Sequence, residues 1–382
     1  MRRRKLFSIV AAAALLVGIA AGCKKEDDSD TIKIGGLAPL TGDVSQYGIA
    51  VNNAVKMAVK EINDNGGILG KQIEYICLDE KGDPDEAVKA YRKLVENEKI
   101  VALLGDVTSK PTEAVAQKAK LDNMPMITAS GTAESITLVG ENVFRACFID
   151  PYQGQLMASY ASKKLGAKTA AILYDTSDTY STGIADAFED AAKDLGMTIT
   201  DKEGYTEGNT DFSSQLTKIR ASNPDVLMLP VYYSDVALIA VQAKNQGITS
   251  KLLGADGWDG VLNQIAESDA DAIANAYFCS QYSASSDDPD LQAFLSEYKE
   301  TYNLEANMFA VLGYDTMYIL ANAIEKAGST DSDAIINALK ETNYDGLTGT
   351  TTFDENRNPV RQAVITSFDG YSYKVVENYS MD

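Results

Sequence analysis

The chain has 382 residues, more than a single hydrophobic core usually covers, so we expect two lobes. Its 34 basic and 55 acidic residues give a formal net charge of −21, which argues against nucleic acid and against an anionic membrane surface as partners, but not against a zwitterionic ligand. The sequence contains no histidine, so it lacks the commonest general base and the commonest transition-metal ligand.

The first 30 residues have the pattern of a secretory leader followed by a lipid anchor. Basic residues at 2–5 precede an uncharged apolar run at 6–21, which is short for a membrane span. Ala20-Ala21-Gly22-Cys23 resembles the lipobox of bacterial lipoproteins, with Ala20 in place of the usual leucine. We therefore predict a signal peptide (1–22), lipidation of Cys23, a charged tether (23–30) and an extracytoplasmic protein anchored to the cell membrane. The alternatives are a plain signal peptide cleaved nearby and an uncleaved anchor.

Short apolar runs then alternate with segments of helical period. Between Tyr47 and Asn63 the apolar residues recur at three- and four-residue spacing, which predicts a helix, and Gly66-Gly67 ends it. In chain order we predict strand 31–37, helix 47–63, strand 73–78, helix 85–97, strand 101–104, helix 111–121 and strand 125–128. This alternation implies a mainly parallel sheet with helices on both faces.

A second series of the same form follows Ile149-Asp150-Pro151. It predicts helix 153–165, strand 169–174, helix 180–195, strand 198–203, helix 212–222, strand 226–229, helix 235–246 and strand 252–255. The predicted fold class is therefore α/β, with two doubly wound lobes. In such folds a ligand binds at the carboxyl ends of the strands, here where the two lobes face each other.

The sequence lacks the motifs of common enzymes. The segment 65–72 looks faintly like a phosphate loop, but it has neither the leading glycine nor a Ser or Thr after Lys71, and we interpret it as a turn. No Gly-x-Ser-x-Gly elbow is present, and a Ser-His-Asp triad is impossible without histidine. We predict no catalytic residue, no metal site and no cofactor. Cys77, Cys147 and Cys279 lie in apolar runs and are expected to be buried free thiols, with one bridged pair as the alternative.

Polar residues cluster after three of the predicted strands. Gly105–Pro111 opens a helix with hydroxyl groups and free amides, which suits an anionic group, although N-capping alone is an equal alternative. Thr128–Ala133 consists of small residues, which allow a ligand close to the backbone or form a simple loop. Leu253–Asp259 places a carboxylate at a strand end, where it could pair with an ammonium group or belong to a turn.

A family resemblance is carried by six motifs, which stand in order at Ile34–Gly42, Gln46–Gly48, Ile62–Gly70, Asp83–Pro84, Pro125–Ala129 and Tyr314–Asp315. From about Thr31 onward the chain is similar to the type I periplasmic binding proteins of the leucine-isoleucine-valine branch, the substrate-binding components of ABC importers. The resemblance implies two lobes that close on a ligand by a hinge motion. It places three crossovers near 149–151, 278–280 and 353–359. Lobe 1 would comprise 31–149 plus 279–355, and lobe 2 would comprise 150–278 plus 356–382.

The resemblance also implies an amino-acid site. Ser109, Thr132 and backbone groups of Ser130 would hold the α-carboxylate, and Gly131 between them is included in the predicted site. The Ser130 carbonyl and the Thr132 hydroxyl would also orient the α-ammonium, which Asp256 would bind in place of the family's glutamate. The aromatic walls of the pocket fall on Tyr47, Tyr180, Tyr232 and Phe309.

The sequence departs from the family in ways that bear on the ligand. The family's disulfide in lobe 1 is missing, Trp258 could narrow the pocket, and Lys110 could attract a second carboxylate. We predict a non-enzymatic, monomeric receptor for a small neutral amino acid, with branched-chain ones first, that delivers it to an ABC permease and its ATPase subunits. The alternatives are an aromatic acid, an amide or urea as ligand, and a sensor that feeds a signalling receptor.

Overall fold

The computed structural model describes residues 31–283 and 285–381. The predicted signal peptide (1–22), the lipidation site Cys23 and the tether (23–30) lie outside these residues. Among the residues that are described, no helix is both long and apolar enough to cross a membrane.

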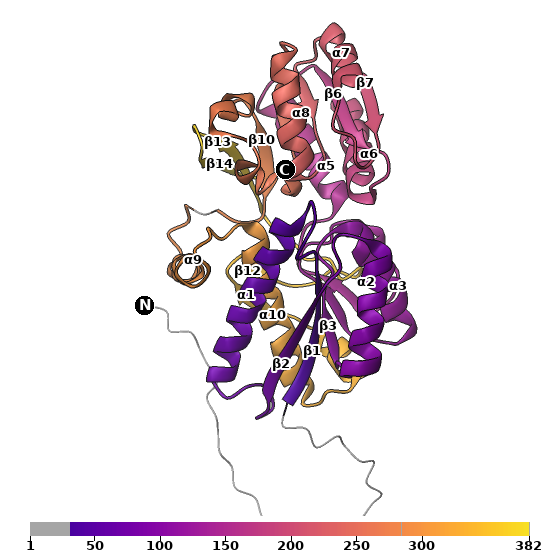
Figure 1. Cartoon of the computed structure of the whole chain (residues 1–382), viewed down its shortest axis with the longest axis vertical. Coiled ribbons are helices and arrows are strands. Elements are labelled where there is room, and N and C mark those ends of the chain that lie inside the picture. Colours follow the sequence, from indigo (N-terminus) through magenta and orange to yellow (C-terminus); the bar gives the residue numbers. More distant parts are fainter. Residues whose placement is uncertain (1–30, 284, 382) are drawn as a thin grey trace, which may run out of the picture. The chain divides into compact units, whose positions relative to one another are not determined.

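The first sheet is parallel and has five strands, in the order β2-β1-β3-β4-β5. Its strands are β1 (Thr31–Ala38), β2 (Gln72–Asp79), β3 (Ala102–Leu104), β4 (Met126–Thr128) and β5 (Val143–Arg145). The helices around it are α1 (Ser45–Asp64), α2 (Pro84–Lys93), α3 (Ser109–Leu121), α4 (Ser135–Leu138), α9 (Pro289–Tyr302), α10 (Met308–Ala327) and α11 (Ser332–Lys340). Helices α1 and α10 cover one face and α2 and α3 the other (Figure 1). We call this part lobe 1.

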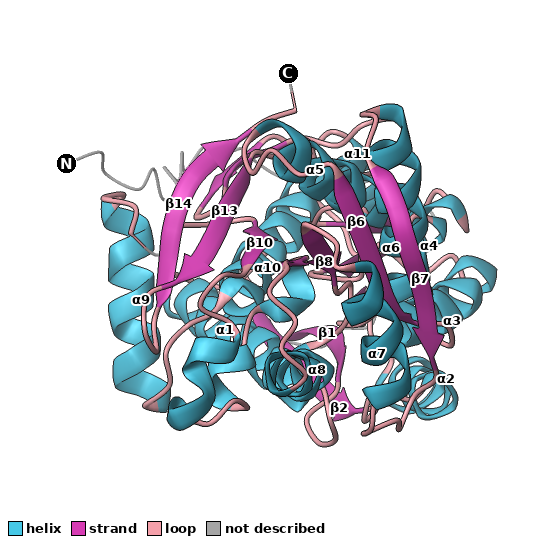
Figure 2. Ribbon diagram, turned by 90° about the horizontal axis from the view of Figure 1, so that it is seen from above, coloured by secondary structure: helices cyan, strands magenta, loops and turns pink. Residues whose placement is uncertain are grey.

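The second sheet has seven strands, in the order β14-β13-β10-β9-β8-β6-β7. Its strands are β6 (Thr169–Asp175), β7 (Thr198–Tyr205), β8 (Val226–Met228), β9 (Lys251–Gly254), β10 (Tyr277–Ser280), β13 (Ala363–Phe368) and β14 (Tyr373–Tyr379). Strands β6 to β10 are parallel to one another. Strands β13 and β14 add an antiparallel edge that lies beside β10 in Figure 2. The α/β class with two lobes is thereby confirmed, and we call this part lobe 2.

The central strands of lobe 2 are buried on both faces. Ala170 and Ile172 of β6 pack against α5 (Asp150–Lys163) and α6 (Thr179–Asp194). Ala171 and Leu173 point the other way, toward α7 (Ser213–Ser222) and α8 (Tyr233–Asn245). Successive strand residues point to opposite faces, so a strand covered on both sides reads as a continuous apolar run.

Local sequence signals set the helix ends. The side chain of Asp83 caps α2 by accepting the N–H groups of Asp85 and Glu86, both at 2.8 Å, and Pro84 occupies the first helical position. The predicted helix 85–97 does not stay α-helical to its end. It closes in a π-helical turn, Leu94–Glu98, and stops at Lys99, whose φ is 60°.

The predicted thiols are free. Cys147 and Cys279 are buried and Cys77 is half-buried, and none of the three forms a disulfide, so the alternative of a bridged pair is wrong for these residues.

The residue boundaries proposed for the lobes stay a prediction, but two sets of contacts bear on them. Cys279 and Ser280 belong to β10 of the seven-stranded sheet. Arg357 packs on lobe 1, because its carbonyl accepts from Arg145 N at 3.3 Å and the Nε of Arg357 donates to Val143 O at 3.2 Å. These contacts would shift the second and third crossovers a few residues toward the C-terminus.

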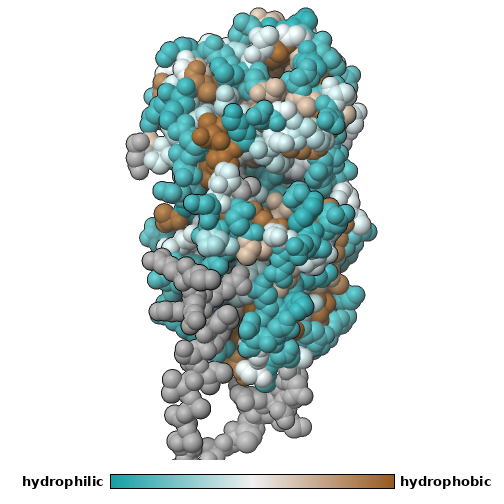
Figure 3. Space-filling model, turned by 90° about the vertical axis from the view of Figure 1, so that its left-hand side faces the viewer, coloured by the Kyte–Doolittle hydropathy of each residue, from teal (hydrophilic) through white to brown (hydrophobic). Residues whose placement is uncertain are grey.

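The surface that Figure 3 displays is mainly hydrophilic, and its hydrophobic residues form small separate groups. Two side chains, Leu121 and Val360, are the most exposed large hydrophobic ones among the described residues, at 78% and 72%. Single exposed apolar residues of this kind are ordinary on a protein surface.

Candidate functional site

One small cavity lies between the carboxyl ends of the strands of the two lobes. It is lined by Tyr47, Val107, Thr108, Ser109, Ser130, Thr132, Tyr180, Tyr232, Asp256, Gly257 and Phe309. The structure therefore brings together all but one of the residues that we predicted for the ligand site. Gly131 is the exception.

Gly131 supports the cavity wall from behind. Its N–H donates to Thr128 Oγ1 at 2.8 Å, and its carbonyl accepts from Arg145 Nη1 at 3.0 Å. A Cβ atom at this position would lie 2.9 Å from Thr112 Oγ1, so only glycine fits. Both backbone groups of Gly131 thus have partners inside lobe 1.

The wall contributed by lobe 1 is made of hydroxyl groups in two loops that are bonded to each other. Ser109 Oγ accepts from the N–H groups of Thr132 (3.2 Å) and Ala133 (3.1 Å). Ser130 Oγ donates to Val107 O at 2.8 Å. These bonds hold the loop after β3 against the loop after β4, so the hydroxyl groups have fixed positions before a ligand arrives.

The N-terminus of α3 points the same way. Ser109 is its first residue, and the preceding Thr108 makes no side-chain capping bond, so the N-capping alternative is not what the structure shows for Thr108. The first amides of a helix lack partners within it and carry partial positive charge. This end of α3 therefore suits a carboxylate.

The wall contributed by lobe 2 centres on Asp256, the first residue of a 3₁₀ turn, Asp256–Trp258, after β9. Gln153 Nε2 donates to Asp256 Oδ1 at 3.1 Å, and Asp256 N donates back to Gln153 Oε1 at 3.0 Å. Burial raises the pKa of the Asp256 carboxyl to about 6, while hydrogen bonds from Tyr180 and Gln153 act in the opposite direction. The donors around this carboxylate are neutral, so it can still pair with a cation.

Two further carboxyl groups of lobe 2 lie beside residues of the cavity wall, the buried Asp150 near Asp256 and the half-buried Asp178 near Tyr232. Burial raises the pKa of Asp178 to about 6 and that of Asp150 well above its ordinary value. The negative charge of Asp256 also raises the pKa of Asp150. The raised pKa favours the protonated, neutral form of Asp150, so the negative charge that suits an ammonium group comes from Asp256 and Asp178.

Aromatic rings close the remaining sides. Tyr47 of lobe 1 stacks on Phe309, with ring centres 4.0 Å apart, and Tyr180 of lobe 2 stacks on Tyr232 at 4.7 Å. Tyr47 and Tyr232 meet edge to face at 5.8 Å, which joins the two pairs across the cleft. Rings of this kind offer an apolar surface to a small side chain.

The lobes are in contact around the cavity. The Tyr47 hydroxyl donates to Gly257 O and accepts from Tyr233 N at 3.2 Å, and Asp259 Oδ2 accepts from Met308 N at 2.7 Å. The space left inside is about 10 Å³, roughly that of one water molecule. Even the smallest amino acid is larger, so the lobes must separate to admit one.

Two predicted effects on the pocket are wrong. Trp258 does not narrow the cavity, because its ring is fully buried beneath the wall, where Nε1 donates to Leu229 O at 2.8 Å and the indole stacks on Phe278. Lys110 does not enter the cavity either. Its ammonium group lies 3.7 Å from a Glu207 carboxylate oxygen and spans the outer rim between the lobes.

Val107, Thr108 and Gly257 also line the cavity and Gln153 is the partner of Asp256, although none of the four was predicted as a site residue. The first three could have been found, because they are immediate neighbours of predicted site residues at two strand ends. Gln153 carries no such signal, since a glutamine within a helix is usually a surface residue.

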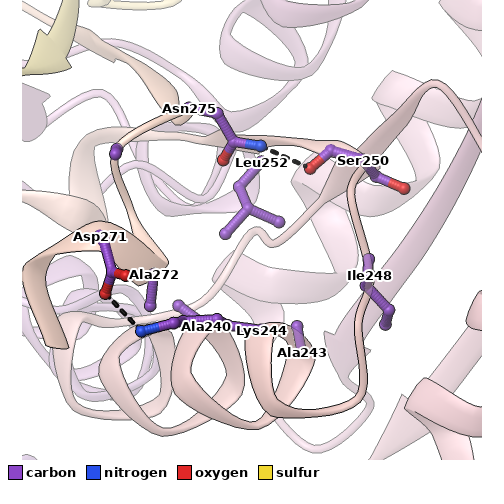
Figure 4. Close-up of a pocket in the computed structure, with 10 residues that line it drawn as sticks. Ala240, Ala243, Lys244, Ile248, Ser250, Leu252, Asp271, Ala272 and Asn275 are labelled. Carbon is purple, nitrogen blue, oxygen red and sulfur yellow. Dashed lines mark hydrogen bonds and ion pairs between the residues drawn. The ribbon is translucent and has the colours of Figure 1, made fainter.

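A second hollow lies on lobe 2, beside α8 (Figure 4), with a volume of about 270 Å³. Lys244 pairs there with Asp271, and Asn275 Nδ2 donates to Ser250 O at 3.1 Å. None of the predicted site residues lines this hollow. Among the described residues, no group of His, Cys, Asp or Glu is arranged to hold a metal ion.

Comparison with known proteins agrees with this geometry. The family described as "Periplasmic binding protein" matches residues 31–372. The chain is 33% identical to the Leu/Ile/Val-binding protein BraC3 of Rhizobium johnstonii over 312 residues, 81% of this chain and 83% of the relative. It is 29% identical to the leucine-, isoleucine-, valine-, threonine-, and alanine-binding protein of Pseudomonas aeruginosa, over 86% of this chain and 87% of that protein.

Among solved structures, the branched-chain amino acid transporter substrate binding protein LivJ from Streptococcus pneumoniae, in complex with isoleucine, superposes with a TM-score of 0.84. The two chains are 34% identical, and the match covers 91% of this chain and 99% of the other.

Proposed function

The chain belongs to the periplasmic binding protein family, and we propose that it is the substrate-binding component of an ABC importer that captures a small neutral amino acid between its two lobes. One observation carries the proposal. Ser109, at the N-terminus of α3 in lobe 1, and Asp256, at a strand end of lobe 2, line the same closed cavity. An α-carboxylate fits the first and an α-ammonium fits the second.

The aromatic rings favour an apolar side chain on this amino acid. Tyr47 and Phe309 form one stacked pair and Tyr180 and Tyr232 the other, and both pairs line the cavity. The named relatives bind leucine, isoleucine and valine, and one also binds threonine and alanine. We therefore propose a branched-chain amino acid as the first ligand to test.

Capture would proceed by closure of the lobes. The separated lobes expose both walls, an amino acid lays its carboxylate on lobe 1, and lobe 2 then brings Asp256 to the ammonium group. The bond from the Tyr47 hydroxyl to Gly257 O, together with that from Met308 N to Asp259, would hold the closed form. This closed form is the one that we expect to dock on the permease.

Membership of this family implies a location outside the cytoplasm. We propose that acylation of Cys23 retains the protein at the membrane beside its importer and that it acts as a monomer. The relatives are binding proteins and not enzymes, and we propose the same for this chain.

Thermal-shift measurements against the twenty amino acids and a set of small aromatic carboxylates, amides and urea would test the function. A ligand present at a hundred times its dissociation constant should stabilise the folded protein by about 2.7 kcal/mol. We expect one or a few neutral amino acids to raise the melting temperature. If only aromatic carboxylates, amides or urea do so, or if nothing does, the zwitterion site is wrong.

A further inference from the structure

We propose that Gln153 positions the Asp256 carboxylate for the ammonium group of the ligand and thereby controls ligand affinity without lining the cavity. This inference rests on the proposed function, because it concerns how one wall of the same site is built.

Gln153 is fully buried on the first turn of α5 and contacts both the backbone and the side chain of Asp256. Its Nε2 donates to Asp256 Oδ1 at 3.1 Å, and its Oε1 accepts from Asp256 N at 3.0 Å. One bond holds the carboxylate and the other holds the backbone of the same residue, so the amide fixes the side chain of Asp256 relative to its own backbone.

A third contact fixes the amide of Gln153 itself. Cys279 Sγ on β10 lies 3.2 Å from Gln153 Oε1 and donates to it. Because Oε1 receives this thiol and the N–H of Asp256, Nε2 must face the carboxylate. The amide thus joins three segments of lobe 2, namely α5, β10 and the turn after β9.

The chemistry of glutamine suits this role. The position requires one donor and one acceptor in one plane, and it must carry no charge. An arginine or lysine here would pair with Asp256 and take the place of the ligand's ammonium group. A second carboxylate would repel Asp256 and favour its protonation. A neutral amide orients the carboxylate and leaves its charge available.

Several titratable groups face Asp256 from the elements packed against it. Tyr180 on α6 hydrogen-bonds it, and Asp259 follows it in the same turn. Five others interact with its charge, namely Asp150 on α5, Cys147 after β5, Cys279 on β10, Tyr47 on α1 and Tyr232 before α8. None of these groups is a cation. Loss of a donor from Gln153 should therefore favour the protonated form of Asp256.

The test is the pH profile of ligand binding to Gln153→Met, which keeps the length of the side chain and removes the amide. Isothermal titration with L-isoleucine between pH 5 and 9 should show affinity reduced about tenfold or more at pH 7, as expected for a lost bond to a charged group. The midpoint of the affinity profile should also move to higher pH, so that part of the loss is recovered at pH 8.5. Gln153→Leu serves as a second variant in case Gln153→Met does not fold. The pH profile of either folded variant is sufficient to test the role of Gln153.

Gln281→Met is the matched control. Gln281 is also buried, and its Oε1 also accepts a backbone N–H, from Phe148 at 3.0 Å, but it does not contact Asp256. This variant should keep the wild-type midpoint. An unchanged midpoint in the Gln153 variants, or an equal shift in the control, would overturn the role of Gln153. Wild-type protein that binds no amino acid would instead refute the proposed function.

Discussion

Lobe 1 faces the cavity with hydroxyl groups and the N-terminus of α3, whereas lobe 2 faces it with the carboxylate of Asp256. The lobe 1 wall carries no charged side chain among its lining residues. Among the residues that the structure describes, no cation pairs with the carboxylate of the lobe 2 wall. A zwitterion matches the pair of walls in only one orientation.

This difference also separates the tasks of the two walls. The lobe 1 hydroxyl groups are tied together within that lobe, so they are ready before closure. Asp256 belongs to the other lobe and reaches a ligand held by lobe 1 only when the cleft closes. A ligand that lacks an ammonium group would thus bind only the lobe 1 wall, and it would stabilise the closed form little relative to the open form.

Removal of the charge from the lobe 2 wall should have the largest effect. Asp256→Asn keeps the shape of the side chain but leaves the ammonium without its anion, and truncation of a buried charge pair costs about 2–5 kcal/mol. We expect calorimetric affinity for the amino acid to fall by about a hundredfold or more. The unliganded variant should melt no lower than wild type, because Asp256 is buried without a cation and a neutral side chain relieves that penalty.

Asp259→Asn is the matched control for this charge. Asp259 is buried in the same turn, and burial raises its pKa to about 6 as well, but it bonds to Met308 N and does not line the cavity. Its loss should weaken closure by only a few-fold in affinity. If both variants lose the same affinity, Asp256 has no special role toward the ammonium group.

Acid should remove the same charge without mutation. Burial raises the pKa of Asp256 from 3.8 to about 6, and the ammonium group needs the ionised form, so affinity should be constant above pH 7 and fall below pH 6. At pH 5 roughly one site in ten is ionised, which predicts about a tenfold loss. Titration calorimetry from pH 5 to 8 measures this, and Asp256→Asn should lack the slope.

The stability of the unliganded protein should change in the opposite direction over that range. A carboxyl with a raised pKa binds more protons in the folded state than in the unfolded state between pH 3.8 and about 6. Its contribution to stability is therefore present at low pH and is lost as the pH rises through 6. If Asp256 causes both effects, Asp256→Asn should remove the pH dependence of affinity and reduce that of stability, of which Asp178 and Asp259 would retain a part because their pKa values are also raised to about 6.

Much of this fold could be predicted from the sequence up to residue 255, where apolar strands and periodic helices alternate. The C-terminal part could not. Helix α10 is buried on nearly all sides, from Met308 to Ile324, so it lacks the polar face that reveals a helix in a sequence. Strand β13 is wholly buried between β10 and β14, and a short apolar run of this kind has no period of its own.

The site divides in the same way. Ser109 and Asp256 could be predicted because polar residues at strand ends meet at one edge of a parallel sheet. The place of Trp258 could not be inferred, because the 3₁₀ turn after β9 directs its ring back under the wall toward Leu229. Nor could Gln153, whose role depends on a contact between positions 103 residues apart.

The lobe 1 wall should respond more weakly to mutation, because its groups are neutral. Ser109→Ala removes one hydroxyl from a carboxylate that the amides of α3 still face. A hydrogen bond to a charged group contributes about 1.5–3 kcal/mol, and the remaining amides compensate in part, so we expect about a tenfold loss of affinity by calorimetry. The melting temperature should also fall, because the N–H groups of Thr132 and Ala133 lose their acceptor.

Thr112→Val is the control for Ser109. Thr112 lies on the same helix and does not itself line the cavity, and its hydroxyl donates to the carbonyl of Thr108. This variant should change stability but not affinity. A hundredfold loss in Ser109→Ala would mean that lobe 1, and not lobe 2, supplies the dominant interaction, which would reverse the comparison of the two walls.

The smallest effect is expected where the walls meet. Tyr47→Phe keeps the ring that stacks on Phe309 but removes the hydroxyl that donates to Gly257 O in the other lobe. Since these groups can bond to water in the open form, only closure is weakened, and we expect a two- to fivefold lower affinity. Small-angle scattering with saturating ligand should still show the compact form. Tyr91→Phe, which loses a bond to Asp122 within lobe 1, should leave affinity unchanged. If Tyr47→Phe also leaves affinity unchanged, the contacts of the two walls with the ligand determine closure, and the bond from the Tyr47 hydroxyl to Gly257 O does not.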